Sequence, residues 1–393
     1  MPNSPRRDRA IRRIKVGLIA FVVFLALGIA GIWLLYDHLI QALDIRNYAS
    51  FAELPVYQWA RVELSAQTSC SDGSRYHIYA RRGESDKLII HFAGGGAAWD
   101  GETASQPLEL TNLNGYYIAS IPEIVRALLS GIFQSDKPEN PFHDWNVIYI
   151  PYCTADFDIG NVIRDYTSPT GKAINFHHSG RQNVTEALDW VYKTFDAPPK
   201  LLVSGDSAGG FASIFWITPI AKHYTASAIY QLADGVYLDS PLWNTIVNDT
   251  WQADAVNQWG FTVTDDLAAS AYLAHLGQPL PNVTYMHINT LYDETLLRFE
   301  AKLNNVQNDA QFHAQWSQRM VASTKRLSES GLNYFYFVTD YGLDSTKGTT
   351  PHTSISSPLF FQIEEENTPL TEWVRRAVIE DQPFSVGAHF WPN

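Results

Sequence analysis

The segment "GDSAG", residues 205–209, places Ser207 at the centre of a G-x-S-x-G pattern. The residues before the serine, "KLLVSG", are typical of a buried strand, and those after it, "AGGFASIFW", are typical of an apolar helix. A serine in a sharp turn from strand to helix exposes its hydroxyl to a substrate, and the two glycines leave room for that turn. Ser207 is therefore predicted to be a nucleophile, with a simple helix cap as the alternative.

A glycine-rich segment lies about 110 residues upstream of this serine, in "HFAGGGAAW", His91–Trp99. Consecutive glycines allow successive backbone N–H groups to converge on one point, which is the arrangement that a developing oxyanion needs. Taken alone, three glycines fit an ordinary flexible turn equally well. Their position after a predicted strand and upstream of Ser207 favours an oxyanion loop.

A nucleophilic serine needs a histidine base and a carboxylate, in the chain order Ser, Asp, His for this kind of enzyme. Asp239 and Asp293 both follow predicted strands. His352 lies in a loop beyond the last predicted strand, whereas His389 lies in an aromatic tail and is the reserve candidate. We prefer Asp293 as the acid because its loop is one strand nearer to the loop of His352.

Short apolar or β-branched runs alternate with longer helical stretches from about Tyr76 onward. Most of these runs are nearly continuous, which is typical of strands that are covered on both faces. The alternation predicts a doubly wound, mostly parallel sheet of the α/β-hydrolase type, in which functional residues collect at the carboxyl ends of strands. The predicted strands are residues 87–93, 146–152, 200–205, 235–240, 284–290 and 333–339.

The composition argues against nucleic acid as a partner. The formal net charge is −13, and basic residues cluster only within the first fifteen positions. The chain has no H-x-x-x-H pair and no Cys/His cluster, so neither a metal site nor another cofactor is expected. A hydrophobic content of 46% over 393 residues is ample for one large core.

The N-terminus is basic and then strongly apolar. Six basic side chains precede the uncharged run "VGLIAFVVFLALGIAGIWLLY", residues 16–36. A bilayer core needs about 20 apolar helical residues, so this run predicts a single transmembrane anchor. The positive-inside rule then places residues 1–15 in the cytoplasm, leaving a stalk at 37–65 and a catalytic domain at 66–393 in the periplasm, a lumen or at the cell surface. The alternative is a signal peptide cleaved after Ala30, which would release a secreted protein.

Several segments, in order, resemble the pectin acetylesterase/Notum family of α/β-hydrolases. The resemblance begins at "CSDGSRYHIYARRGESDKLIIHFAGGGAAW" and continues through "YCTADFDIG" and "SGRQNVTEALDWV". It extends through "GDSAGG", "LDSPLW" and "NTLYDETLL", and covers the chain from about Cys70 to His352. It differs from the family pattern where Ala97 and Ala98 separate the glycines from Trp99, and where Thr353 follows the histidine.

This resemblance implies hydrolysis of a carboxylic ester, either O-acetyl or another O-acyl group, on a polysaccharide or an acylated protein. It assigns the triad to Ser207, Asp293 and His352, and makes Asp239 a structural residue. The remaining implied roles are oxyanion donors at the N–H groups of Gly95, Gly96 and Ala208, and substrate contacts at Trp99, Tyr152 and Trp243. Together with an oxidising location, the resemblance also predicts a disulfide between Cys70 and Cys153.

Two other functions remain open at this point. Esterases and lipases related to hormone-sensitive lipase also combine GDSAGG with an upstream glycine-rich loop, but they lack the YC-x-x-D loop. A catalytically inactive hydrolase fold that serves as a membrane-tethered binding module is the alternative from a different class. All three triad positions can be filled in this sequence, which favours an enzyme. The acyl length and the acyl acceptor are not specified by these patterns.

Overall fold

The computed structural model describes residues 42–109, 111–122 and 124–391. The predicted cytoplasmic and transmembrane segments, residues 1–15 and 16–36, lie outside the described residues. Within the part of the chain that is described, no helix has both the length and the apolar composition needed to cross a bilayer.

The chain divides into two compact units. One unit consists of Met1–Ala42 with Glu123–Leu128, and its described helix is α3 (Val125–Leu128). The other unit, Leu43–Pro122 with Leu129–Asn393, contains the remaining elements described below.

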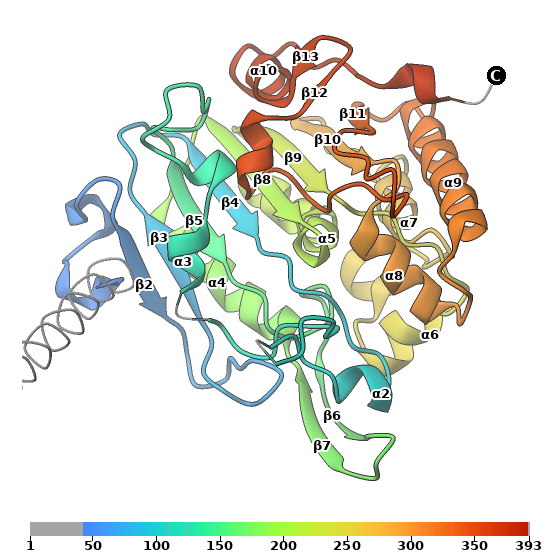
Figure 1. The fold of residues 1–393 in the computed structure, drawn as a ribbon. Coiled ribbons are helices and arrows are strands. Elements are labelled where there is room, and N and C mark those ends of the chain that lie inside the picture. Colours follow the sequence, from blue (N-terminus) through green and yellow to red (C-terminus); the bar gives the residue numbers. More distant parts are fainter. Residues whose placement is uncertain (1–41, 110, 123, 392–393) are drawn as a thin grey trace, which may run out of the picture. The chain divides into compact units, whose positions relative to one another are not determined.

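A nine-stranded sheet forms the centre of the larger unit (Figure 1). Neighbouring strands are parallel throughout, except that the third strand in the order is antiparallel to both of its neighbours. This topology confirms the predicted mostly parallel sheet. In spatial order the strands are β1 (Leu43–Asp44), β2 (Trp59–Glu63), β3 (His77–Arg81), β5 (Asn146–Ile150), β4 (Leu88–Phe92), β8 (Lys200–Asp206), β9 (Ala228–Asp234), β10 (Val283–Thr290) and β11 (Tyr334–Thr339).

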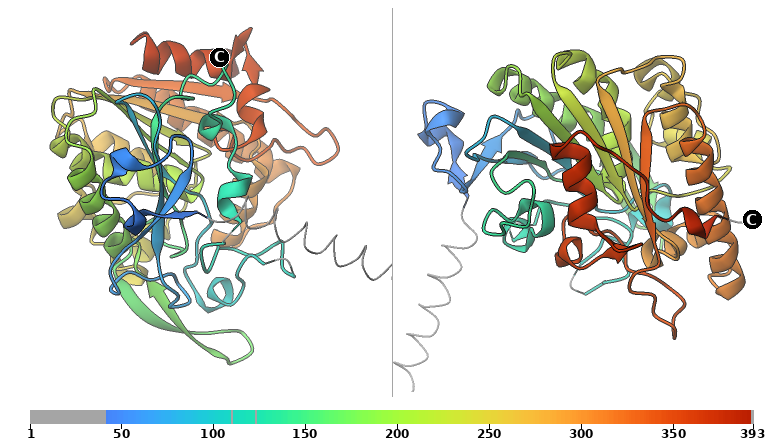
Figure 2. Two further views of the ribbon diagram at one scale, coloured as in Figure 1. Left: turned by 90° about the vertical axis from the view of Figure 1, so that its left-hand side faces the viewer. Right: turned by 90° about the horizontal axis from the view of Figure 1, so that it is seen from above.

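Helices cover both faces of this sheet (Figure 2). The central strands β4 and β5 are buried along their whole length because neither of their faces reaches water. The helices of the larger unit are α2 (Gly101–Ala104), α4 (Gly180–Thr194), α5 (Ala208–His223), α6 (Trp243–Thr245), α7 (Leu267–Ala274), α8 (Glu294–Leu303), α9 (Ala310–Ser328) and α10 (Leu370–Val374).

The predicted strand at residues 235–240 is wrong, whereas each of the other five predicted runs overlaps a strand of the central sheet almost completely. The strand that precedes this run is β9, which ends at Asp234, one residue before the predicted strand begins. Apolar residues continue past this point in "GVYL", so the composition alone did not locate the end of the strand. Gly235 ends it by adopting a φ of +69°, which is accessible mainly to glycine. Asp239 therefore lies beyond the turn and not at the end of a strand.

Two further features were not predicted. The segment expected to be a stalk, residues 37–65, contributes β1 and β2 to the central sheet. A hairpin of β6 (Val162–Thr167) and β7 (Ala173–His178) projects from the body of the unit (Figure 1). Its inward aromatic side chains, Tyr166 and Phe176, pack in one cluster with Ala98 from the glycine-rich loop.

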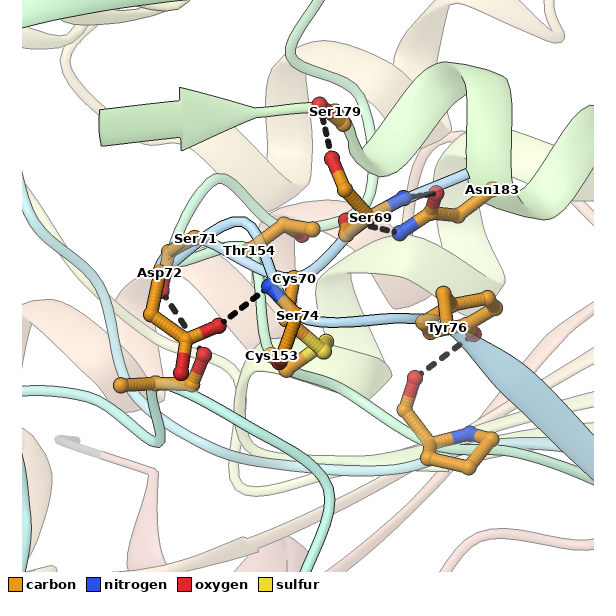
Figure 3. The surroundings of a disulfide bond; sticks show 12 residues. Ser69, Cys70, Ser71, Asp72, Ser74, Tyr76, Cys153, Thr154, Ser179 and Asn183 are labelled. Atoms are coloured by element: carbon orange, nitrogen blue, oxygen red, sulfur yellow. Dashed lines mark hydrogen bonds between the residues drawn. A yellow bond between two sulfur atoms is a disulfide. The ribbon is translucent and has the colours of Figure 1, made fainter. Parts of the chain in front are cut away.

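A disulfide joins Cys70 to Cys153, with their Cα atoms 5.0 Å apart (Figure 3). The main chain reinforces this link, because the Ser71 N–H donates to the Cys153 carbonyl at 2.8 Å. The sequence separation is 83 residues, and closing a loop of that length disfavours the unfolded chain by about 4.5 kcal/mol in the chain-entropy model. The disulfide ties the segment before β3 to the loop after β5, which lies beside the glycine-rich loop.

Candidate active site

Ser207 occupies a strained turn between β8 and α5. Its φ is 54° and its ψ is −124°, a conformation that a residue with a side chain adopts only when the surrounding structure enforces it. Its N–H donates to the carbonyl of Asp234 at 2.8 Å, which ties the turn to the end of the adjacent strand β9. A Cβ atom on Gly205 would lie 2.0 Å from the Gly209 carbonyl oxygen, so the turn needs this glycine. The geometry is that of a nucleophile elbow.

The glycine-rich loop after β4 lies directly against this serine. The Gly94 N–H donates to Asp206 Oδ1 at 2.7 Å, and a Cβ atom on Gly94 would lie 3.0 Å from the Cβ of Ser207. The next two residues, Gly95 and Gly96, were predicted to donate N–H groups to an oxyanion. A Cβ atom on Gly95 would lie 2.4 Å from the Tyr152 ring, and one on Gly96 would lie 1.9 Å from the Tyr116 carbonyl oxygen. This loop therefore needs both glycines, and their role as oxyanion donors stays a prediction.

His352 and Asp293 are paired although 59 residues separate them in the chain. The imidazole Nδ1 lies 2.7 Å from Asp293 Oδ2. The other carboxylate oxygen, Oδ1, accepts the N–H groups of Thr295 and Leu296 at 3.0 and 2.9 Å, so Asp293 also caps α8. With Nδ1 donating to the carboxylate, Nε2 is the proton acceptor, and it is buried without a hydrogen-bond partner.

Two opposing effects set the pKa of His352. Burial alone would lower it, but the charge of Asp293 and the hydrogen bond to it outweigh burial and raise the pKa above its ordinary value of 6.5. More distant carboxylates, Asp234 and Asp206, act in the same direction. The imidazole of His352 is therefore protonated more readily in this site than it would be in water.

Ser207 and His352 each contact one residue of the corner formed by Asp234 and Gly235. Ser207 bonds to the Asp234 carbonyl, and a Cβ atom on Gly235 would lie 3.2 Å from His352 Cε1. The structure thus pairs His352 with Asp293, and it places Ser207 and His352 against two adjacent residues at the carboxyl end of β9. This is where α/β sheets place their functional residues.

The sequence matches the family model for pectinacetylesterase over residues 58–262, slightly more than half of the chain. The chain belongs to the pectinacetylesterase family. This confirms the resemblance inferred from the motifs and supports an esterase-type hydrolase. The matched segment includes the glycine-rich loop and the elbow, whereas Asp293 and His352 lie beyond it.

A solved structure shows the same fold. The Wnt deacylase Notum from Drosophila matches with a TM-score of 0.58 at 16% sequence identity, covering 84% of this chain and 97% of that one. At this identity the likeness establishes the α/β-hydrolase-like fold alone. No curated protein matched the chain in a sequence search.

The alternative acid and base have other partners in this pectinacetylesterase family member. Asp239 Oδ2 lies 3.2 Å from Arg319 Nε, and the Asp239 N–H donates to the buried carboxylate of Glu300 at 2.8 Å. His389 Nδ1 pairs with Glu366 at 2.8 Å, near the C-terminus.

The three predicted substrate contacts occupy different environments. Trp99 is half-buried, and its ring lies 6.0 Å from that of Tyr116. Tyr152 is 2% exposed, and its hydroxyl donates to the Gly96 carbonyl at 2.8 Å. Trp243 is 1% exposed and donates its Nε1–H to the Leu238 carbonyl. Tyr152 and Trp243 thus bond to the protein itself, and a contact with substrate stays a prediction for all three.

Two carboxylates at the site were not singled out in the sequence. Asp206 and Asp234 end adjacent strands β8 and β9, where they stand opposite each other in register. The sequence does contain a signal for these two carboxylates. In both "GDS" and "ADG" an aspartate comes at the end of an apolar run, directly before a residue that favours a turn. Their register depends on tertiary structure, and it was not visible in the chain.

The loop "YCTADFDIG" beside the glycine-rich loop contains two buried carboxylates, of which Asp156 is the more fully bonded. It accepts hydrogen bonds from the Thr154 hydroxyl at 2.6 Å and from the Gly180 N–H at 3.0 Å. Burial nevertheless raises the pKa of Asp156 to about 7. The folded protein therefore favours the neutral carboxyl.

We expect this carboxyl to make stability pH-dependent. Because the folded pKa lies above the ordinary value of 3.8, its stabilising contribution is complete below that value and is lost as the pH rises through about 7. Thermal denaturation between pH 5 and 8 should show a smaller fall in melting temperature for Asp156→Asn than for the unmodified protein. Asp189→Asn, on the exposed side of α4, is the control; equal slopes in all three proteins would contradict the assignment.

Proposed function

We propose that this protein is a serine carboxylic ester hydrolase that removes an acyl group through a covalent acyl-enzyme. The observation that supports this most strongly is the pair of His352 and the buried Asp293, because His352 contacts the same strand-end corner as the strained turn of Ser207. Membership of the pectinacetylesterase family supports the same reaction class. An ester of a polysaccharide or of an acylated protein is the proposed substrate.

In the proposed first half-reaction, Ser207 Oγ attacks the ester carbonyl and its proton passes to His352 Nε2. The carbonyl oxygen becomes an oxyanion that accepts hydrogen bonds from the N–H groups of Gly95, Gly96 and Ala208. Collapse of this intermediate expels the alcohol, which takes the proton from the imidazolium. The serine is left acylated.

In the second half-reaction, water attacks the acyl-enzyme while His352 accepts its proton. The carboxylic acid then leaves as the proton returns to Ser207. Asp293 holds the imidazole in the tautomer with Nε2 free and stabilises the imidazolium that forms twice in the cycle. Two backbone N–H groups already bond to the Asp293 carboxylate, which fixes its orientation before substrate arrives.

We also propose that residues 16–36 anchor the chain in a membrane, with the catalytic unit on the extracytoplasmic side. The disulfide between Cys70 and Cys153 supports an oxidising compartment, in which such bonds persist. Mass spectrometry of the mature protein should then find the N-terminal segment intact. A mature chain that starts at or after Gly31 would instead identify the segment as a cleaved signal peptide.

Substitutions within the triad should separate its members by the size of their effects. Ser207→Ala and His352→Ala should each lower kcat on p-nitrophenyl acetate by roughly 10³-fold or more, and Asp293→Asn by somewhat less. Asp239→Asn is the matched control, which should reduce stability while leaving turnover close to normal. The assignment fails if folded His352→Ala keeps normal activity, or if Asp239→Asn loses more activity than Asp293→Asn. Esters from acetate to palmitate, assayed with the unmodified protein, would define the preferred acyl length.

The raised pKa of His352 predicts the acid limb of the pH profile. General-base catalysis needs the neutral imidazole, so activity is lost as the pH falls through the pKa of this group. Because its pKa lies above 6.5, kcat/KM should decline at a higher pH than it would for an unperturbed histidine. A steady-state profile from pH 5 to 9 tests this. A midpoint below 6.5 would contradict it.

A further inference from the structure

The ends of β8 and β9 present two acidic side chains next to each other. Asp206 and Asp234 are partners in the parallel register, and they are 8% and 2% exposed. Two carboxylates held this close in a poorly hydrated place repel each other, which is costly unless both are well bonded. Neither residue has a chemical step in the mechanism proposed above.

Asp234 holds both the nucleophile and the segment that follows the base. Its main-chain carbonyl accepts the Ser207 N–H at 2.8 Å. Its side-chain Oδ2 accepts three further hydrogen bonds, from the Ser354 N–H at 2.6 Å, the Ser354 hydroxyl at 2.9 Å and the Ile355 N–H at 2.9 Å. One residue thus connects the elbow to the chain two residues beyond His352.

The neighbouring Gly235 brings the same corner against the imidazole. Its φ of +69° turns the chain away from β9, and a Cβ atom there would lie 3.2 Å from His352 Cε1. The ring therefore lies close to the backbone of the corner, and its Nδ1 bonds to Asp293. A movement of the Ser354–Ile355 segment would change the distance between the side chains of His352 and Ser207.

Asp206 adds a second link to the same loop. Its Oδ1 accepts the Gly94 N–H at 2.7 Å, and its Oδ2 accepts the Ser356 hydroxyl. The loop of the base is thereby connected to the oxyanion loop as well as to the elbow. Asp234 makes more of these bonds and is more deeply buried, so it is the stronger candidate for a defined role.

We propose that Asp234 is a positioning residue. It holds Ser207 and His352 at the distance needed for proton transfer, and its negative charge stabilises the imidazolium. This inference rests on the proposed function, because it assumes that these two residues exchange a proton. Asp234 contacts neither the substrate nor the reacting atoms in this scheme. It acts through the segment that carries the base.

The charges around the imidazole are consistent with this role. The carboxylates that raise the pKa of His352 are Asp293, Asp234 and Asp206. Burial raises the pKa of Asp234 to about 6 and the Asp206 charge adds to that rise, whereas the hydrogen bonds from Ile355 and Ser354 lower the pKa. His91 lies 3.9 Å from Asp206, but burial lowers its pKa to about 4 and leaves it neutral.

Asp234→Asn can separate charge from geometry. All three side-chain bonds end on Oδ2, so a single amide oxygen can accept them, whereas the negative charge is removed. We expect the acid limb of the kcat/KM profile on p-nitrophenyl acetate to move to lower pH by roughly half a unit. A profile that coincides with that of the unmodified protein would overturn the charge effect.

Asp234→Ala removes the geometric link as well. We expect kcat to fall roughly 10²-fold with little change in KM, because a displacement of about 1 Å between catalytic groups has that effect. Ser354→Ala, which removes one of the three bonds, should lower kcat in the same direction by a smaller factor. A folded Asp234→Ala variant with normal kcat would overturn the positioning role. If that variant does not fold, a normal kcat in Ser354→Ala together with an unshifted pH profile in Asp234→Asn would overturn it instead.

The matched control is Asp266→Asn. Asp266 is a half-buried carboxylate that also has a raised pKa, but it caps α7 through the Ala269 N–H and pairs with Arg326. This variant should leave the pH profile unmoved even if stability falls.

Ser207→Ala and His352→Ala are assayed alongside the Asp234 variants. If both keep their activity, the proposed function fails; if both are inactive and the Asp234 variants behave as the unmodified protein, the positioning inference alone fails.

Discussion

The hydrogen bond from the Ser207 N–H to the Asp234 carbonyl joins the end of one parallel strand to the turn that follows its neighbour. A residue with φ of 54° and ψ of −124° is strained, and it keeps this conformation only if fixed neighbours hold it. Here the fixed neighbours are the ladder between β8 and β9 on one side and the packed helix α5 on the other. Because the glycine-rich loop and the loop of His352 both bond to these two strand ends, the geometry of the whole candidate site depends on the register of β8 with β9.

The loop that carries His352 has little regular structure of its own, so polar contacts hold it in place. On one side, the Thr350 N–H donates to the Tyr292 carbonyl at 2.8 Å and the Glu294 N–H donates to the Thr350 carbonyl at 3.1 Å. On the other side, Asp234 accepts three hydrogen bonds from the residues after the histidine. The imidazole is thus held between two fixed points. Buried hydrogen bonds specify such a geometry more sharply than apolar packing, because an unmet polar group is costly.

Buried carboxylates near the site carry a cost in stability. The raised pKa values of Asp156 and Asp234, about 7 and about 6, mean that their charged forms are disfavoured by folding near neutral pH. Asp156 bonds within the loop beside the glycine-rich loop, and Asp234 bonds to the loop of His352. The disulfide between Cys70 and Cys153 counteracts part of this cost by restricting the unfolded chain, and it is joined to the loop that contains Asp156.

Short-range sequence patterns specify those elements of the protein that form among residues close together in the chain. The strand, turn and helix around Ser207, the glycine-rich loop and five of the six predicted strands follow from short-range patterns, because backbone sterics and burial act within a few residues. The tertiary structure alone decided where β9 ends, since the apolar run continues through Gly235 and only its left-handed conformation stops the strand. It also decided that His352 pairs with Asp293 while Asp239 pairs with Arg319. Asp234 became visible only in the folded chain, because its partners at Ser207 and Ser354 come from segments that meet through the register of parallel strands.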